Sequence, residues 1–168
     1  MAGQQEAVAV AAKAGKYLTF KLGAEEFGLE ILKVQEIIGM MKVTKVPRAP
    51  HFIRGVINLR GKVIPVVDLR TKFGMAGKED TERTCIIVVQ VTHPGGNVTM
   101  GTIVDDVSEV LDVQTEQIEP TPSFGSSVDT DFILGMGKIG PKVIMLLDID
   151  RVLSGAQVAS IENLAEDA

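Results

Sequence analysis

The side chains that could perform catalysis or bind a metal are few and scattered along this sequence of 168 residues. Its two histidines, His51 and His93, have no neighbouring set of cysteine, histidine or carboxylate ligands. The single cysteine, Cys85, lies in the apolar run "TCIIVVQV", which favours a buried strand residue over a reactive thiol. The acidic clusters "VDD", "DTD" and "DID" are typical of turns and solvated strand ends. With no P-loop, nucleophile elbow, kinase signature or zinc-protease motif, the sequence predicts neither a metal site nor a catalytic cluster.

One segment, "GMGKIG" at residues 135–140, matches the glycine pattern of dinucleotide-binding loops. That chemistry needs a helix directly after the glycines, because the helix N-terminus holds the phosphates. Pro141 and the apolar run "KVIMLLDI" follow instead, and they indicate a strand. We therefore interpret residues 135–140 as a loop between strands and predict no nucleotide cofactor.

The turn "NLRG" contains an arginine, Arg60, that chain reversal does not require. Asn58 and Gly61 already provide the backbone freedom that a tight turn needs. The guanidinium of Arg60 offers a planar fork of donors that suits a carboxylate or carbonyl of another protein. Two interpretations stay open from the residues alone: Arg60 binds a partner, or it is a solvated turn residue.

Composition and net charge restrict the class of protein to which this sequence can belong. Hydrophobic residues make up 45% and charged residues 23% of the chain, which is typical of a soluble globular domain. The net charge of −5 and the lack of a basic block argue against nucleic-acid binding. No apolar run approaches the roughly 20 residues that span a bilayer, and the start lacks the basic region of a secretory signal. We therefore expect a cytoplasmic protein with no direct membrane insertion.

Short apolar runs separated by Gly, Pro, Asn or Asp recur along the chain and predict an all-β fold, either a barrel or a sandwich. The run "KYLTFKLG", residues 16–23, alternates apolar and polar residues and predicts a half-buried strand, with "AEEFGLEI" as its hairpin partner. The run "ILKVQEII", residues 31–38, predicts a short helical turn followed by a strand. Pro65 cannot donate to a strand ladder, so we expect it at an edge or a bulge.

The chain contains an internal repeat. The segment "FIRGVINLRGKVIPVVDL" from Phe52 aligns without a gap with "FILGMGKIGPKVIMLLDI" from Phe132. The segment "GLEILKVQEII" from Gly28 aligns with "GTIVDDVSEVL" from Gly101, at a slightly shorter separation along the chain. An insertion around "SFGSSVDTD" accounts for the difference. We interpret the chain as two copies of one small all-β unit that together bury surface which neither copy can bury alone.

Comparing the copies separates positions that the fold needs from positions that differ. Asp68 matches Asp148, so we expect both to be strand-end or turn carboxylates rather than catalytic groups. Glu36 has a twin in Glu109, which favours a structural role. The turn "NLRG" aligns with "KIGP", so an arginine occurs at this position in the first copy alone, which favours partner binding.

Four segments, in this order and spacing, resemble the CheW family of bacterial chemotaxis coupling proteins: "YLTFKLGAEEFGLEILKVQEI", "FIRGVINLRGKVIPVVDLRTKFG", "GTIVDDVSEVL" and "LLDIDRVL". The resemblance covers residues 16–155 and implies two intertwined five-stranded SH3-like barrels with short helical segments and a groove between them. Residues 1–15 are then a flexible N-terminal tail, and residues 156–168 are a C-terminal tail able to form a helix. The related CheA and CheV proteins carry further domains, so we expect a freestanding CheW-like domain.

The resemblance implies a non-enzymatic adaptor with no cofactor and no metal. It would couple the cytoplasmic tips of methyl-accepting chemoreceptors to the regulatory domain of the histidine kinase CheA, and would associate with membrane receptor arrays through these partners. The helical receptor tip is expected in the apolar groove between the lobes, and the kinase on the lobe surfaces. Two other hypotheses remain: a related adaptor for a different receptor and kinase pathway, or a small-ligand-binding enzyme on a double barrel, which would need convergent polar groups.

Carried over residue by residue, the resemblance implies two groups of binding residues. The receptor-binding positions are Val34, Glu36, Ile37, Arg60, Val107 and Val110. The kinase-binding positions are Arg60, Gly61 and Phe124. The repeat pairs Val34 with Val107 and Ile37 with Val110, so equivalent positions of the two lobes are expected to face one another. For Phe124 an alternative stays open, in which its ring covers the second barrel.

Overall fold

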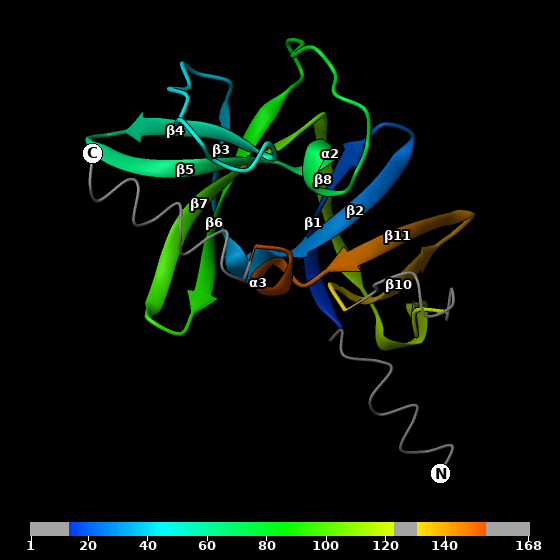
Figure 1. Ribbon diagram of the computed structural model, residues 1–168. Helices are drawn as coiled ribbons and strands as arrows, with labels where there is room; N and C mark the ends of the chain where they lie inside the picture. Colours follow the sequence, from blue (N-terminus) through cyan, green and yellow to red (C-terminus); the bar gives the residue numbers. More distant parts are fainter. Residues whose placement is uncertain (1–13, 123–130, 154–168) are drawn as a thin grey trace.

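The computed structural model of the protein describes residues 14–122 and 131–153, and the structural statements below concern these residues. The described strands are β1 (Gly15–Leu22), β2 (Glu25–Glu30), β3 (Val34–Gly39), β4 (Ile53–Leu59), β5 (Lys62–Asp68), β6 (Cys85–His93), β7 (Gly96–Val104), β8 (Asp106–Val113), β9 (Ile118–Glu119), β10 (Ile133–Ile139) and β11 (Lys142–Leu147). The short helical segments between them are η1 (Ile31–Lys33), α2 (Leu69–Lys72), η2 (Thr115–Gln117) and α3 (Ile149–Val152). Figure 1 shows two β lobes with α2 and α3 near their junction, so the all-β fold class is confirmed.

Each lobe is one sheet whose two ends are joined by a short segment. The five-stranded lobe has the order β3-β6-β7-β5-β4, and the six-stranded lobe has the order β8-β1-β2-β11-β10-β9. In the first, β3 continues through residues 40–43 to Thr44, which bridges to Val56 of β4 at the other end of the sheet. In the second, β8 continues through residues 114–117 to β9, which pairs with β10. Joining the ends curls each sheet into a small barrel. The six-stranded lobe differs from the expected five strands by the short strand β9.

The internal repeat recurs in the register of the strands. In the five-stranded lobe, β5 runs parallel to β7 with Val66 opposite Gly101. In the six-stranded lobe, β11 runs parallel to β2 with Leu146 opposite Gly28. The sequence repeat aligns Val66 with Leu146 and Gly101 with Gly28, so the two ladders pair equivalent residues. The predicted duplication is therefore present in the strand order and in the register of both lobes.

The two copies exchange their first hairpins. The hairpin β1–β2 precedes β3 in the chain, yet it lies in the six-stranded lobe beside β8 and β11. The hairpin β6–β7 of the second copy completes the five-stranded lobe between β3 and β5. Each lobe therefore contains strands from both copies, which is why the lobes are intertwined and why neither copy forms a complete barrel by itself.

The largest apolar cluster lies between the lobes, and we call it the central cluster. Its buried residues, none more than 7% exposed, are Leu18, Phe20, Leu22, Phe27, Leu29, Ile53, Val67, Leu69, Ile87, Val89, Val91, Met100, Val104, Leu147, Ile149, Val152 and Leu153. Separate smaller clusters fill the interiors of the six-stranded and five-stranded lobes. Because burying one large apolar side chain contributes about 1.5–3 kcal/mol, the central cluster is the main attachment between the lobes.

Two predictions about individual strands were wrong. β1 is buried on both faces: Leu18 and Phe20 face the central cluster, whereas Tyr17 faces the interior of the six-stranded lobe. The strand is shared between two cores, and its exposed side chains are those of Lys16 and Lys21 near its ends. Pro65 lies in β5, an interior strand between β4 and β7, rather than at an edge. It is tolerated there because the ladder between β5 and β7 starts one residue later, at Val66.

Several other local predictions are confirmed. The segment after β2 forms the helical turn η1 followed by the strand β3. Asp68 ends β5 and Asp148 directly follows β11, and their carboxylates accept hydrogen bonds from the first turns of α2 and α3 (3.1 Å from Arg70 N and 3.1 Å from Asp150 N). The "GMGKIG" segment lies in β10 and its turn to β11, and no helix follows it directly.

Closure of the five-stranded lobe depends on a glycine. Gly55 has φ +149°, and a Cβ atom at this position would lie 2.1 Å from the carbonyl oxygen of Thr44. Thr44 is the residue whose amide and carbonyl groups both hydrogen-bond to Val56, at 2.8 Å each. Any side chain at Gly55 would push Thr44 away and open the barrel where its ends meet.

Candidate functional site

Glu36 and Arg60, two of the predicted binding residues, form an ion pair with each other. Glu36 lies in β3, and Arg60 lies in the turn between β4 and β5. Arg60 therefore has a carboxylate partner within its own lobe, whereas the sequence prediction was a carboxylate or carbonyl of another protein. Arg60 stays exposed, and exposed ion pairs contribute only about 0–1 kcal/mol, so its guanidinium can exchange Glu36 for another carboxylate at little cost.

The backbone of Arg60 explains why this arginine is not a requirement of the turn. Arg60 has φ +52°, in the left-handed region, and its counterpart in the second copy is Gly140 with φ +60°. A non-glycine residue in this conformation costs about 1–2 kcal/mol. The turn itself is held by Asn58, whose Oδ1 accepts a hydrogen bond from the Gly61 amide at 2.8 Å. The fold would be served at least as well by glycine at position 60, which supports a role for Arg60 outside folding.

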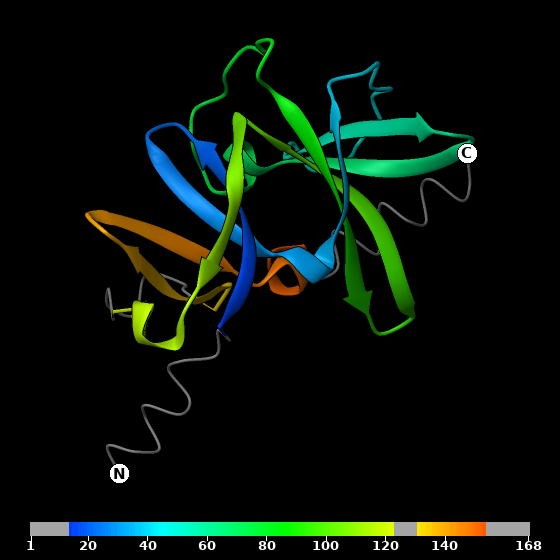
Figure 2. The same cartoon turned by 180° about the vertical axis from the view of Figure 1, so that it is seen from behind.

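The apolar predicted residues lie on the terminal strands of the two sheets. Val34 of β3 and Val107 of β8 are partly buried and pack against the central cluster. Ile37 and Val110, their neighbours on the same strands, are 45% and 48% exposed. Figure 2 shows the light-blue β3 and the yellow-green β8 on either side of the junction between the lobes. The equivalent residues Val34 and Val107 therefore both pack against the same central cluster, from the terminal strands of the two sheets.

The junction beneath these residues is filled. Because the central cluster is almost completely buried, the described residues leave no open apolar interior between the lobes for a helix to enter. The apolar positions predicted for the groove are the exposed Ile37 and Val110 and the partly buried Val34 and Val107. A partner would lie across these positions.

The remaining predicted positions lie next to Arg60 or outside the described residues. Gly61 has φ +88° and is exposed, with open space where a Cβ atom would lie. Phe124 lies outside the described residues, as do residues 1–13 and 154–168 of the predicted tails. Glu109, which the repeat pairs with Glu36, has different contacts. Among the described residues its side chain forms no ion pair, and its carbonyl oxygen accepts a hydrogen bond from Thr19 Oγ1 at 2.8 Å.

A charged cluster that the sequence analysis missed connects the lobes at Asp105. Its carboxylate accepts hydrogen bonds from the Arg70 side chain (2.7 Å from Nε and 2.7 Å from Nη2) and from the Gly23 amide (2.7 Å). The side chains of Arg70 and Asp105 are only 15% and 13% exposed. Burial disfavours the carboxylate, but the hydrogen bonds from Arg70 and Gly23 outweigh this and lower the pKa of Asp105. The prediction of a solvated carboxylate in "VDD" was wrong for Asp105, because its partners are distant in sequence.

A second charged cluster is formed by α3, the helix equivalent to α2, and here the helix provides the anion instead of the cation. The Asp150 carboxylate accepts hydrogen bonds from Lys33 Nζ at 2.7 Å and from the Thr92 amide at 2.8 Å. Asp150 aligns with Arg70 in the repeat that pairs Phe52 with Phe132, and each is the second residue of α3 or α2. An anion on one helix therefore corresponds to a cation on the other. The sequence signal was this charge reversal between Arg70 and Asp150; their partners Asp105 and Lys33 do not align with each other in the repeat.

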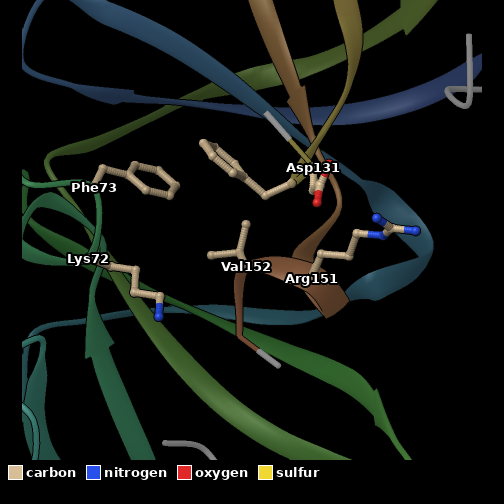
Figure 3. A pocket seen from close by; sticks show the side chains of 6 residues that line it. Lys72, Phe73, Asp131, Arg151 and Val152 are labelled. Atoms are coloured by element: carbon tan, nitrogen blue, oxygen red, sulfur yellow. The ribbon is translucent and has the colours of Figure 1, made fainter. Parts of the chain in front are cut away.

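A pocket with a cavity volume of about 270 Å³ lies beside α2 and α3 (Figure 3). Its lining residues are Lys72, Phe73, Asp131, Phe132, Arg151 and Val152. The Lys72 ammonium lies 4.1 Å from the centroid of the Phe52 ring, and burial lowers the pKa of Lys72. In Figure 3 the ammonium of Lys72 and the guanidinium of Arg151 lie on opposite sides of Val152. The charged groups of Lys72 and Arg151 therefore do not converge on one point of the pocket, where they could act together on a bound ligand.

Other candidate sites receive no support from the described part of the chain. It contains no group of three or more His, Cys, Asp or Glu residues able to hold a metal ion. Cys85 begins β6 and packs against the central cluster, and burial raises the pKa of its thiol, as expected for an unreactive strand residue. None of the described helices is long and apolar enough to cross a membrane.

Comparison with known proteins agrees with this architecture. Residues 16–157 match the family model described as CheW-like domain. The chain is 42% identical to the chemotaxis protein CheW of Klebsiella aerogenes, over 90% of this chain and 89% of that protein. It is 39% identical to CheW of Rhizobium meliloti, over 80% of this chain and 84% of that protein. The crystal structure of the scaffolding protein TtCheW from Thermoanaerobacter tengcongensis superposes with a TM-score of 0.75 at 35% identity, covering 86% of this chain and 96% of that one.

Proposed function

Because the chain belongs to the CheW-like family of non-enzymatic chemotaxis scaffolds, we propose that it couples chemoreceptors to the histidine kinase CheA. The observation that carries this proposal is the surface across the junction of the lobes. Two exposed aliphatic side chains, Ile37 and Val110, lie there on the terminal strands of both lobes, and the Glu36–Arg60 ion pair lies on the same lobe as Ile37. The surface would hold the protein at membrane receptor arrays in the cytoplasm through its partners.

The receptor would bind through the apolar face of its helical tip. The contact residues are Val34, Glu36, Ile37, Val107 and Val110, together with Arg60 at the edge. A helix that presents apolar residues to an apolar surface is a common mode of peptide recognition. Since the central cluster is closed, the helix would lie across β3 and β8 and bury Ile37 and Val110.

The kinase regulatory domain would contact the turn that carries Arg60 and Gly61, and the segment that carries Phe124. The left-handed backbone of Arg60 is a local cost that the turn does not need, and an interaction with another protein would offset it. The guanidinium could leave Glu36 and bind a carboxylate of the kinase, since bidentate pairing suits both groups.

Coupling between the two partners would pass through the central cluster. Val34 and Val107 touch both the proposed receptor surface and this cluster, which contains residues of both lobes. A displacement of β3 relative to β8 would therefore change the packing of both barrels against the central cluster. Allosteric coupling requires two binding sites and two states of the protein, and the arrangement of the lobes around one shared core supports such a change.

A binding experiment with both partners tests the proposal. The full chain is incubated separately and together with a chemoreceptor signalling fragment and the CheA regulatory domain, and complexes are measured by pull-down and size-exclusion chromatography. We expect binary complexes with each partner and a ternary complex with both. Absence of both binary complexes would refute the proposal, and would favour a related adaptor that serves a different receptor and kinase.

A further inference from the structure

Leu32 is a large apolar side chain in η1, and it is 93% exposed. A single exposed leucine needs no special explanation in a folded protein. Here, however, the residue lies immediately before β3, the strand that carries Ile37 and Val34. Neither the central cluster nor the two lobe interiors include it.

The internal repeat pairs position 32 with a residue that has a structural role in the other copy. In the alignment that pairs Gly28 with Gly101, Leu32 corresponds to Asp105, the carboxylate at the centre of the first charged cluster. In the other half of the molecule the neighbouring residue, Lys33, forms the equivalent ion pair with Asp150. The connection between the lobes is therefore complete without residue 32, and an apolar side chain stands where the fold uses a carboxylate in the other copy.

The turn that carries Leu32 is held on both sides. Lys33 is fixed by its ion pair to Asp150, at 2.7 Å, and Asp150 is fixed in turn by the Thr92 amide. The backbone N–H of Val34 donates to the carbonyl oxygen of Ile31 across the turn. An exposed side chain on a preorganised turn loses little backbone entropy when a partner binds it.

The spacing along the chain indicates what kind of partner can reach both Leu32 and Ile37. The two positions are five apart in the sequence, and an extended chain covers at most about 3.3–3.6 Å per residue, so their Cα atoms are at most roughly 16–18 Å apart. An α-helix rises about 1.5 Å per residue, so this distance corresponds to no more than about three turns. In Figure 2, η1 leads directly into β3 at the junction of the lobes.

We propose that Leu32 is an anchor residue that extends the receptor-binding surface beyond β3. It contacts the apolar face of the same partner helix that covers Ile37, up to three helical turns away from that contact. The occupant is an amphipathic helix of the partner, because η1 leads directly into β3, which carries Ile37, and because Lys33 and Asp150 already neutralise each other beside Leu32. This inference rests on the proposed function and adds to it a residue that the family resemblance did not assign.

The test measures binding of a chemoreceptor signalling fragment to variants of the full chain by isothermal titration calorimetry. Leu32→Ala is expected to unfold at the temperature of the wild type and to bind about fivefold to tenfold more weakly, since it loses part of the burial of one leucine. Leu32→Met, which keeps an apolar side chain of similar size, is expected to retain most of the affinity. Val143→Ala is the matched control, because Val143 is 54% exposed in β11 and has no place in the proposed surface.

Ile37→Ala separates a failure of this inference from a failure of the proposed function. Weaker binding of Leu32→Ala and Ile37→Ala, with normal binding of Val143→Ala, supports the inference. Normal binding of Leu32→Ala beside weak binding of Ile37→Ala overturns it and leaves the proposed function intact. An effect of Leu32→Ala on binding of the CheA regulatory domain alone also overturns it, because the occupant would then be the kinase. If the wild type does not bind the fragment, the proposed function and the inference fail together.

Discussion

Replacing Asp105 with alanine removes the carboxylate that joins Arg70 and the Gly23 amide across the junction of the lobes. The Arg70 guanidinium, which is 15% exposed, would lose its charged partner and keep only its hydrogen bond to the Ala76 carbonyl oxygen. Breaking a fully buried ion pair from one side costs about 3–5 kcal/mol, and the remaining exposure of Arg70 reduces this to about 2–4 kcal/mol. For a chain of this size, 1 kcal/mol shifts Tm by roughly 2–4 °C, so we expect Tm to fall by roughly 4–16 °C.

Thermal and urea unfolding followed by circular dichroism measure this effect. Asp150→Ala is the matched control, because the second cluster is more exposed and its loss should lower Tm by less. Replacing Arg70 and Asp105 together with leucine should cost less than the sum of the two single changes, because neither charge is then left unpaired. An unchanged Tm for Asp105→Ala, or strictly additive single changes, would refute the role of this cluster.

The same carboxylate predicts a pH dependence. Because folding lowers the pKa of Asp105, its contribution to the free energy of unfolding is present above the unfolded pKa of about 3.9. The contribution is lost as the pH falls through the lower pKa of the folded state. In Asp105→Asn the free energy of unfolding should therefore decrease less steeply with acidification than in the wild type. Equal slopes below about pH 4 would contradict the assignment.

Three further changes test the fold and the proposed interfaces. Arg60→Ala should unfold like the wild type yet weaken receptor-dependent kinase activation, and a loss of stability as large as that of a core truncation would show that Arg60 serves the turn. Phe124→Ala should leave receptor binding intact and weaken array assembly, whereas unchanged pull-down of CheA would count against a kinase contact. Gly55→Ala should lower the free energy of unfolding by about 3 kcal/mol or more, because its Cβ atom would collide with the Thr44 carbonyl oxygen; a wild-type Tm would show that the barrel closes without this contact.

Local sequence signals predicted much of the secondary structure because they depend on residues close in the chain. Asp68 and Asp148 were recognised as strand-end carboxylates from the repeat, and each caps the short helix that follows it. The helical turn before β3 and the hairpin before it were also recognised from their own residues. The prediction for β1 was wrong in burial, because alternation assumes one core and one solvated face whereas this strand lies between two cores.

The exchange of hairpins could not be derived from the repeat itself. Since β1–β2 and β6–β7 are equivalent copies, either hairpin satisfies the same strand order and the same register in either lobe. Only the family resemblance implied that the barrels are intertwined. The ion pair between Glu36 and Arg60 was equally hidden, because both residues were recognised as candidates but nothing in their spacing shows that they meet.

The sequence by itself determined that the protein is a duplicated all-β unit with no local catalytic or metal-binding motif, and that Arg60 occurs in one copy alone. The tertiary structure decided which copy supplies each hairpin, that the junction of the lobes is a closed apolar core, and that Asp105 and Asp150 pair there with the distant cations Arg70 and Lys33. The physical reason is that apolar periodicity specifies which faces must be buried, whereas the partner of each face is chosen by contacts between residues far apart in the chain.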